Sequence, residues 1–292
     1  MKVLNFGSLN IDRVYRVPHF VRKGETLSSN GYDVFAGGKG LNQSVALAKA
    51  GADVFHAGKI GPDGLFLKKE LSDHDVHTEF IEETGSVTGH AIIQVTDAGE
   101  NSILLFGGAN KEITEEQILR VLDYFEAGDM LVMQNELNQL ETILDSAYEK
   151  GMILAFNPSP MTDQLKKLNL KKLGYLILNE IEAETLTEEK DLEKVLKKLR
   201  KQAPELKVVL TRGEEGVIYE DENQRITQKS FPAEVVDTTA AGDTFLGYFL
   251  SMVSCGKGTE EALEMSSKAS SIAISRAGAS ASIPLLDEIG EF

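Results

Sequence analysis

Short apolar runs alternate with amphipathic stretches from about residue 115 to the end of the chain. Four of the runs are continuously apolar, which is typical of parallel strands covered on both faces: Leu131–Met133, Ile153–Phe156, Tyr175–Leu178 and Val208–Leu210. Apolar residues at helical spacing predict helices near 115–126, 139–150, 181–187, 191–202, 240–254 and 259–275. This order predicts an α/β fold with a doubly wound, mostly parallel sheet.

Two other regions have the period-two alternation of half-exposed strands. One comprises residues 12–17 and 29–36, and the other comprises residues 89–96 and 102–107, which a polar turn joins. We expect a small β-sheet lid, formed by about 12–36 and 89–107, inserted into a single α/β domain that spans residues 1–292. The apolar face of such a sheet is covered by an active-site cleft, by a second subunit, or by both. The lid therefore predicts a homodimer.

The segment from Asp237 to Phe245 carries the most specific chemical signal. Apolar residues at helical spacing from Phe245 onward predict a helix that begins around 240–242. The small residues Ala240, Ala241 and Gly242 would let a phosphate approach the unpaired amides and the positive end of the helix dipole. Asp243, in the first turn, is a candidate general base for a substrate hydroxyl. The alternative is that Asp243 is only an acidic residue that stabilises the helix N-terminus.

A second glycine-rich segment runs from Phe35 to Gly51. Its glycine spacing matches neither the P-loop nor the Rossmann fingerprint. The turn would end a lid strand, open a helix and direct Lys39 and Asn42 towards a polyol in the cleft. The alternative is a structural turn with a solvated lysine.

Composition excludes several classes of partner. The chain has 292 residues and a formal net charge of −16, which argues against a nucleic-acid or anionic-membrane partner. No stretch approaches the roughly 18 apolar residues of a membrane span, and the N-terminus lacks the pattern of a secretory signal. The single cysteine, Cys255, excludes an internal disulfide and is expected to be a packing residue. We expect a cytoplasmic protein.

With both glycine-rich segments present, the chain resembles the ribokinase-type carbohydrate kinases, also called the phosphofructokinase B family, over essentially its whole length. Residues 7–12 are similar to the opening strand of that family, residues 37–43 to its first signature, and residues 237–245 to its second. The three matches are well separated and occur in the right order.

The resemblance implies transfer of the γ-phosphoryl group of ATP to a primary hydroxyl of a sugar. Asp243 would be the base, and Ala240, Ala241 and Gly242 would form the anion hole. The residues that would bind the sugar are Asn10, Asp12, Gly38, Lys39, Asn42, Glu136 and Asp243.

The same resemblance implies nucleotide and metal contacts. Residues that would contact ATP are Asn179, Thr211, Gly213, Ala241, Gly242 and Ser267. Glu182 would order water around Mg²⁺, although Asn179 and Glu182 also fit a simple helix cap. A monovalent cation, expected to be K⁺, would lie among Asp237, Thr239, Ile274, Ala277, Gly278 and Ser282.

Lys39 and the opening Gly-Ser-x-Asn-x-Asp sequence favour D-ribose as the substrate and D-ribose 5-phosphate as the product. The alternatives are another sugar, a sugar phosphate or a nucleoside, or a sugar-binding regulator without catalysis. Two departures from the pattern bear on selectivity. Leu41 stands where ribokinases usually have alanine, and Ser267 stands where Asn or His usually lines the adenine pocket.

Overall fold

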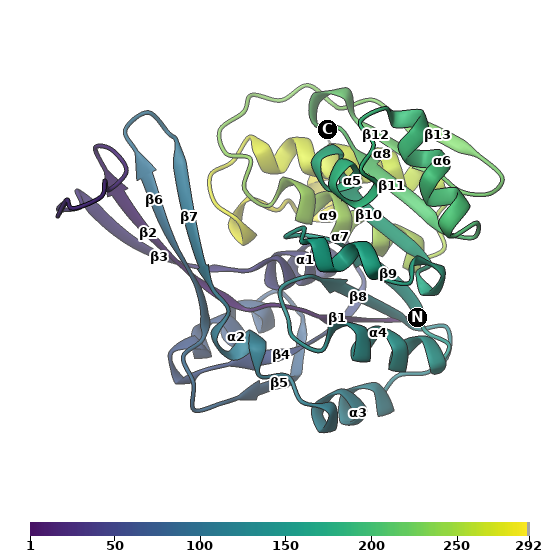
Figure 1. The fold of residues 1–292 in the computed structure, drawn as a ribbon, viewed down its shortest axis with the longest axis horizontal. Helices are drawn as coiled ribbons and strands as arrows, with labels where there is room; N and C mark the ends of the chain where they lie inside the picture. Colours follow the sequence, from purple (N-terminus) through teal and green to yellow (C-terminus); the bar gives the residue numbers. More distant parts are fainter. Residues whose placement is uncertain (291–292) are drawn as a thin grey trace.

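A nine-stranded sheet forms the centre of the computed structural model, which describes residues 1–290 (Figure 1). Its strands lie in the order β13, β12, β11, β10, β9, β8, β1, β4, β5. Their bounds are β1 (Lys2–Phe6), β4 (Asp53–Ile60), β5 (His77–Glu83), β8 (Met130–Gln134), β9 (Ile153–Asn157), β10 (Tyr175–Asn179), β11 (Lys207–Thr211), β12 (Val217–Glu220) and β13 (Arg225–Gln228). Adjacent strands from β5 to β11 are parallel, whereas β12 pairs antiparallel with both β11 and β13. The predicted fold class is therefore confirmed.

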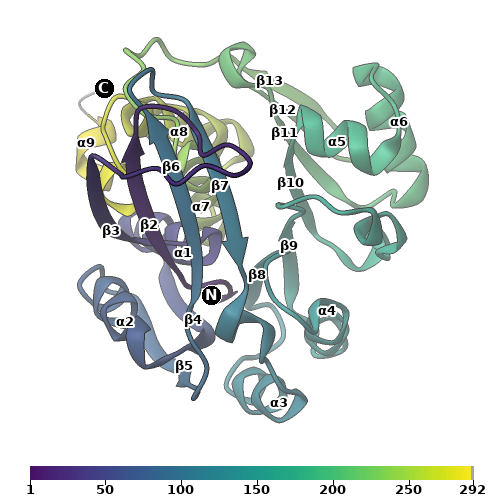
Figure 2. The same ribbon diagram turned by 60° about the vertical axis from the view of Figure 1, so that its left-hand side comes forward.

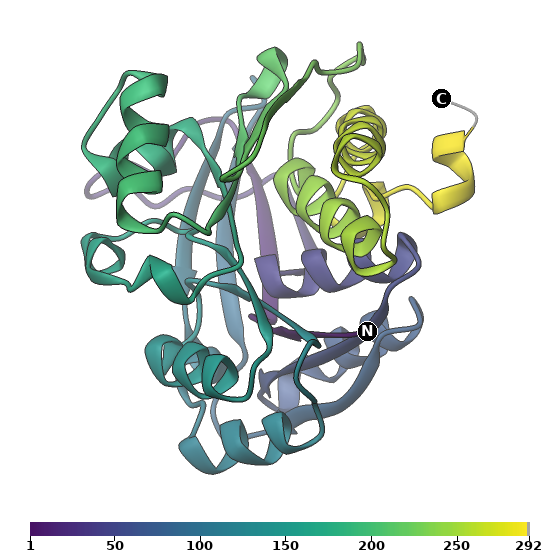
Figure 3. The ribbon, with the colours of Figure 1, turned by 90° about the vertical axis from the view of Figure 1, so that its right-hand side faces the viewer.

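Helices cover both faces of this sheet, as the continuously apolar strands require. Val3 and Val132 pack on one face, and Leu4 and Met133 on the other. The first face is covered by α1 (Lys39–Lys49), α2 (Leu65–Ser72), α7 (Ala241–Ser254) and α8 (Thr259–Ile274). The second is covered by α3 (Glu115–Asp123), α4 (Leu140–Glu149), α5 (Glu180–Thr187) and α6 (Leu192–Gln202), and the two layers are visible in Figures 2 and 3. The short helix α9 (Leu286–Gly290) ends the described part of the chain.

The second sheet has four strands in the order β3, β2, β6, β7 and projects from one end of the molecule (Figure 1). Its strands are β2 (Asn10–Val17), β3 (Gly31–Gly37), β6 (Gly89–Thr96) and β7 (Asn101–Phe106). Two antiparallel hairpins, β2–β3 and β6–β7, join through the parallel pair β2–β6. The predicted small sheet therefore forms. That the chain is a single domain stays a prediction, and its residues 291–292 lie outside the described residues.

Helix α7 packs closely on α1, and a glycine permits this approach. A Cβ at Gly247 would lie 2.4 Å from the Cβ of Ala46 and 2.8 Å from the Leu47 amide nitrogen. A larger residue would push the two helices apart. Since α1 begins at Lys39 and α7 carries Asp243 in its first turn, this packing sets the distance between the two glycine-rich segments.

Two further sequence expectations concern Cys255 and the membrane. Cys255 follows the last residue of α7 and is exposed, so the expectation that it is a packing residue was wrong. Within residues 1–290, no helix combines the length and the apolar character needed to cross a membrane.

Candidate active site

The N-terminus of α7 lies where the sequence predicts it. Ala240 is the residue that precedes the helix, with φ 59° and ψ 8°, a left-handed conformation uncommon for a residue other than glycine. Within residues 1–290, the backbone amides of Gly242 and Asp243 have no hydrogen-bond acceptor. A Cβ at Gly242 would meet no atom within 4 Å, so this turn borders open space. Such a helix N-terminus is suited to a phosphate.

The carboxylate of Asp243 is buried, with 6% of the residue exposed, and faces the first turn of α1. Gln43 Nε2 donates to Asp243 Oδ1 over 2.8 Å, and Asn42 Nδ2 donates to Oδ2 over 3.4 Å. Lys39 Nζ lies 3.9 Å from Oδ1. The negative charge of Asp243 is the main reason that the pKa of Lys39 lies above its ordinary value. Asp243 and the second glycine-rich segment therefore belong to one site.

Glu136, in the segment after β8, anchors the turn between β1 and β2. Its Oε2 accepts hydrogen bonds from Ser8 Oγ and, over 3.0 Å, from the Lys39 amide. Burial raises the pKa of Glu136 above its ordinary value, although these hydrogen bonds and the charge of Lys39 oppose the shift. Glu136 thus contacts Lys39, another residue of the predicted sugar-binding set.

Asp12 and Asn10 enter the site from β2. A Cβ at Gly37 would lie 2.1 Å from Asp12 Oδ2, so only glycine on β3 leaves room for this carboxylate. Among the described residues, the Asp12 carboxylate has no hydrogen-bond partner. Burial, followed by the negative charge of Glu136, raises the pKa of Asp12 to about 7. Asn10 differs, because its Oδ1 accepts from Asn110 Nδ2 over 2.8 Å.

Of the predicted sugar-binding residues, Glu136 and Asp243 lie beside Lys39, Asn42 contacts Asp243, and Asp12 lies near Glu136. The Oδ1 atom of Asn42 is buried and has no hydrogen-bond partner among the described residues. Sequence reasoning gave no role to a further set of polar residues in this region: Asn5, Ser8, Gln43, Asn110, Gln134 and Asn157. Gln43 stands in the glycine-rich signature and could have been found there. The others lie on separate strands and turns, and only the fold brings them together.

The residues predicted to contact ATP lie mostly at the ends of β10 and β11 and in α8. Asn179 and Glu182 form a complete capping box for α5, with Glu182 N donating to Asn179 Oδ1 over 2.9 Å and Asn179 N to Glu182 Oε2 over 3.0 Å. Asn179 and Glu182 therefore do cap α5, as the alternative interpretation expected. Glu182 also contributes to raising the pKa of Lys39, after Asp243 and Glu136, so its charge acts on the same site. Ser267 is buried in α8.

The turn after β11 is tied to α5. Thr211 Oγ1 donates to the Leu178 carbonyl oxygen over 3.4 Å, and Arg212 Nε donates to Glu180 over 3.1 Å. Gly213 follows with φ +54°, a left-handed conformation that favours glycine. Arg212 also pairs with Glu215, so carboxylates hold it and it is not free to meet a triphosphate.

Four of the residues predicted to hold a monovalent cation are directly linked. Asp237 accepts from the Thr239 amide over 2.9 Å and from the Gly278 amide over 3.0 Å, while its own amide donates to the Ile274 carbonyl over 3.1 Å. Burial opposes ionisation of Asp237, but hydrogen bonds from Thr239 and Gly278 lower its pKa below the ordinary value. Ser282 instead contacts Ala279, over 2.8 Å, in the turn that contains Ala277. Among the described residues, no group of three His, Cys, Asp or Glu side chains is placed to hold a metal ion.

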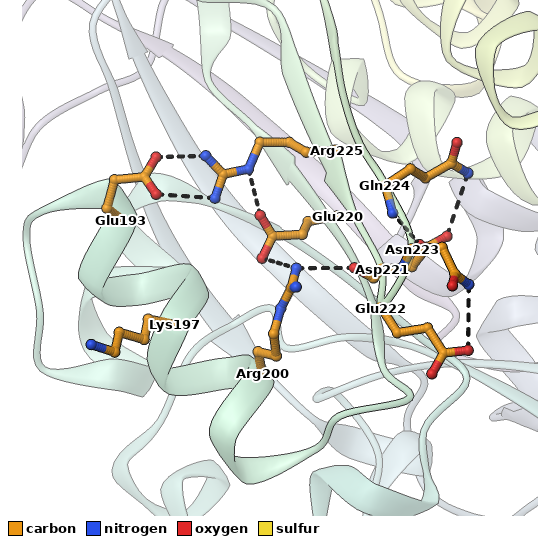
Figure 4. A pocket seen from close by; sticks show the side chains of 9 residues that line it. All are labelled: Glu193, Lys197, Arg200, Glu220, Asp221, Glu222, Asn223, Gln224 and Arg225. Carbon is orange, nitrogen blue, oxygen red and sulfur yellow. Dashed lines mark hydrogen bonds and ion pairs between the residues drawn. The ribbon is translucent and has the colours of Figure 1, made fainter.

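A hollow of about 490 Å³ between α6 and the β12–β13 hairpin contains many charges but is a poor candidate for the site (Figure 4). Its buried carboxylate, Glu220, pairs with Arg200 and Arg225, and Arg225 also makes two contacts with Glu193. These charged side chains thus form ion pairs with one another. The turn between β12 and β13 also lies at the amino-terminal end of β11, where Glu220 pairs with Val208, and therefore at the opposite end from Thr211.

Comparisons with known proteins identify the family of the chain. The family model described as "pfkB family carbohydrate kinase" matches residues 1–286. A ribokinase of Haemophilus influenzae is 34% identical over 299 residues, which cover 98% of this chain and 96% of the relative. The solved ribokinase of Thermotoga maritima is 32% identical with a TM-score of 0.91, covering 100% of this chain and 98% of that one. An Arabidopsis thaliana ribokinase complexed with ribose and ATP is 26% identical with a TM-score of 0.87, covering 99% and 97%. The chain therefore belongs to the pfkB family of carbohydrate kinases.

The raised pKa of Asp12 predicts that this carboxylate destabilises the ligand-free fold at high pH. Its pKa rises from 3.8 when unfolded to about 7 when folded, so its contribution to stability is greatest below pH 4 and is lost as the pH rises to 7. Asp12→Asn should therefore raise the free energy of unfolding at pH 8 by about 1–3 kcal/mol, with a smaller gain at pH 5. Urea unfolding at both pH values measures this difference.

Asp97→Asn, at an exposed position beyond β6, is the matched control and should change stability little at either pH. A gain for Asp12→Asn that is equal at pH 5 and pH 8 would contradict the assigned cause.

Proposed function

We propose that this kinase transfers the γ-phosphoryl group of ATP to the primary hydroxyl of D-ribose, giving D-ribose 5-phosphate and ADP. The observation that carries the proposal is the buried Asp243 carboxylate beside two unpaired amides at the N-terminus of α7. A base and an anion site in contact suit a hydroxyl that attacks a phosphoryl group. The similarity to ribokinases supports the choice of sugar.

In this mechanism Asp243 accepts the proton of the sugar hydroxyl as its oxygen bonds to the γ-phosphorus. The bond from that phosphorus to the β,γ-bridging oxygen breaks, and ADP leaves with the electron pair. The amides of Gly242 and Asp243 stabilise the charge on the transferring group. Lys39, 3.9 Å from Asp243, adds positive charge on the side of the sugar.

The polar residues around Lys39 would fix the sugar. Asn42 Oδ1 has no partner and the Asp12 carboxylate has none among the described residues, so both can accept hydrogen bonds from vicinal hydroxyls. We propose that Mg²⁺ is held through water near Glu182 and that K⁺ lies beside the Asp237–Gly278 contact. Bound Mg²⁺ would neutralise charge on the phosphates. A site with one buried carboxylate, Glu182, suits an ion that keeps most of its water ligands.

The charge balance favours a neutral sugar over a sugar phosphate. Lys39 and Lys111 are the cations near Glu136, and Lys39 is already paired with Asp243, so the site offers little free positive charge for a phosphate on the sugar. Leu41 does not alter this balance, because its side chain is fully buried in the core. Its departure from alanine is thus a packing difference.

The substrate is tested by ADP release with Mg-ATP and K⁺ over a panel of pentoses, hexoses, sugar phosphates and nucleosides. We expect selective turnover of D-ribose, because the site offers hydroxyl acceptors and little positive charge. Replacing K⁺ by Na⁺ or by a bulky organic cation should lower kcat. Selective turnover of another compound would contradict D-ribose as the substrate but would still support phosphoryl transfer. Equal rates with all cations would contradict the K⁺ proposal.

Asp243→Asn should lower kcat by about 10²- to 10⁴-fold, because it removes the proton acceptor. Sugar binding, measured by titration calorimetry, should change far less. Asp123→Asn, at the exposed end of α3, serves as the control. Near-normal turnover by Asp243→Asn would exclude its role as base. Sugar binding without turnover in the unchanged protein would instead favour a regulator.

We also propose that the small sheet covers the sugar and forms a homodimer with a second copy of itself. Residues paired directly across strands share a face, so Asp12 shares its face with Phe35, Ala91 and Leu105. On that face Phe35 is 51% exposed, Leu105 51% and Ile103 55%. The opposite face mixes apolar side chains with Arg13 and Gln94. An identical sheet supplies a matching apolar surface.

The double variant Ile103→Glu, Leu105→Glu should convert the dimer to a monomer, because four charges would be buried in each dimer. Sedimentation velocity measures the change. Leu104→Glu, on the opposite face of β7, is the control and should leave the dimer intact. A monomeric unchanged protein would exclude the dimer, and a Leu104→Glu monomer would place the interface on the other face.

A further inference from the structure

A chain of buried polar side chains runs from Asp243 into the core beneath the sheet. Gln43 Nε2 donates to Asp243 Oδ1 over 2.8 Å, and Gln43 Oε1 accepts from Gln134 Nε2 over 2.6 Å. Gln134 Nε2 also donates to Asn5 Oδ1 over 3.0 Å. These three amides are at most 1% exposed and come from α1, β8 and β1. Burial of so many polar groups is costly unless they form hydrogen bonds with one another.

The far end of the chain fixes the direction of its hydrogen bonds. Asn5 Nδ2 donates to Ser44 Oγ over 2.9 Å, and Ser44 Oγ lies 2.8 Å from His56 Nδ1. His56 Nε2 lies 3.2 Å from the Gly7 carbonyl oxygen, which can only accept, so Nε2 carries the proton and Nδ1 accepts from Ser44. Burial lowers the pKa of His56 to about 3, which keeps this ring neutral. Asn5 therefore presents its oxygen to Gln134.

The orientation of Gln134 follows from its two neighbours. Both hydrogens of its amide are used, one towards Asn5 and one towards Gln43. Its Oε1 atom is buried and has no partner. Flipping the amide would direct that oxygen at two other oxygens, so the unsatisfied acceptor is retained. Gly7 leaves room for this arrangement, since a Cβ there would lie 2.9 Å from Gln134 Oε1.

We propose that Gln43 is a positioning residue for Asp243 and that Gln134 fixes the direction in which Gln43 donates. Gln134 occupies the oxygen of Gln43, so the amino group of Gln43 faces Asp243. That donation holds Oδ1, while Oδ2, which accepts only the longer 3.4 Å contact from Asn42, would meet the substrate hydroxyl. The inference rests on the proposed role of Asp243 as base.

The charged groups that face Asp243 are Lys39 from α1 and Glu136 from the segment after β8. Gln43 adds a donor without adding a charge. It orients the carboxylate through a hydrogen bond rather than through a contact ion pair.

The test uses Gln134→Glu, a change that does not touch Asp243. When ionised, the introduced carboxylate cannot donate, so Gln43 would turn its amino group towards that carboxylate and present its oxygen to Asp243. With saturating sugar, the pH at which kcat falls to half on the acidic side should rise by about one unit. kcat should fall at least about tenfold, while KM for the sugar changes by less than about threefold. Gln134→Met should have a smaller effect on kcat and on the pH profile, because it does not reverse the orientation of the Gln43 amide.

Gln117→Glu is the matched control. Gln117 is also fully buried with an unpaired Oε1, but its Nε2 donates to the Gly58 carbonyl oxygen over 3.1 Å, away from Asp243. It should lower stability without moving the pH profile. If Gln134→Glu does not fold, Gln43→Met decides, since it removes the donor to Oδ1 and should shift the profile in the same direction.

An unchanged pH profile and kcat in folded Gln43→Met would overturn the proposal. Equal losses in Gln134→Glu and Gln134→Met with an unmoved profile would also overturn it, because they would indicate packing alone. The role of Asp243 is judged separately: an active Asp243→Asn variant removes the proposed function, whereas an inactive one with unmoved Gln43 and Gln134 variants removes only this inference.

Discussion

The close packing of α1 on α7 is the contact on which the site depends. Gly247 lets the two helices approach, and their first turns then carry Lys39, Gln43 and Asp243 into one cluster. The helices belong to segments about 200 residues apart in the sequence. Each one alone offers an ordinary helix N-terminus. Together they give an anion site bordered by a carboxylate and a lysine, which is the arrangement that phosphoryl transfer requires.

Electrostatics gives this arrangement a cost in the free protein. Two carboxylates, Glu136 and Asp243, lie near Lys39, and a third, Asp12, lies near Glu136; burial raises the pKa of Asp12 and of Glu136 above their ordinary values. Hydroxyl donors of a bound sugar would stabilise the ionised forms. The ligand-free fold therefore stores unfavourable charge that the substrate relieves, so the residues that weaken the fold are those expected to bind the sugar.

Local sequence predicted the parts of the structure that depend on local rules. Helical spacing after Phe245 gave the start of α7 within a residue, and the continuously apolar runs gave the central strands, because periodicity reports directly which faces are buried. The polar network could not be predicted from the sequence, because Asn5 and Gln134 become neighbours of Gln43 only when three separate elements come together in the fold. The burial of Leu41 in the core was likewise not apparent, because a residue within a signature can face the core instead of the ligand.

The use of neutral amides beneath Asp243 fits the requirements of its proposed role as a base. A lysine or arginine in contact with its carboxylate would hold the ionised form strongly and so weaken its attraction for the hydroxyl proton. Gln43 instead orients the carboxylate through one hydrogen bond, while Lys39 remains 3.9 Å away, beyond hydrogen-bonding distance. Orientation and charge are thus supplied by different residues. The geometry of the base can then be set from the core, and its charge environment from the side that meets the substrate.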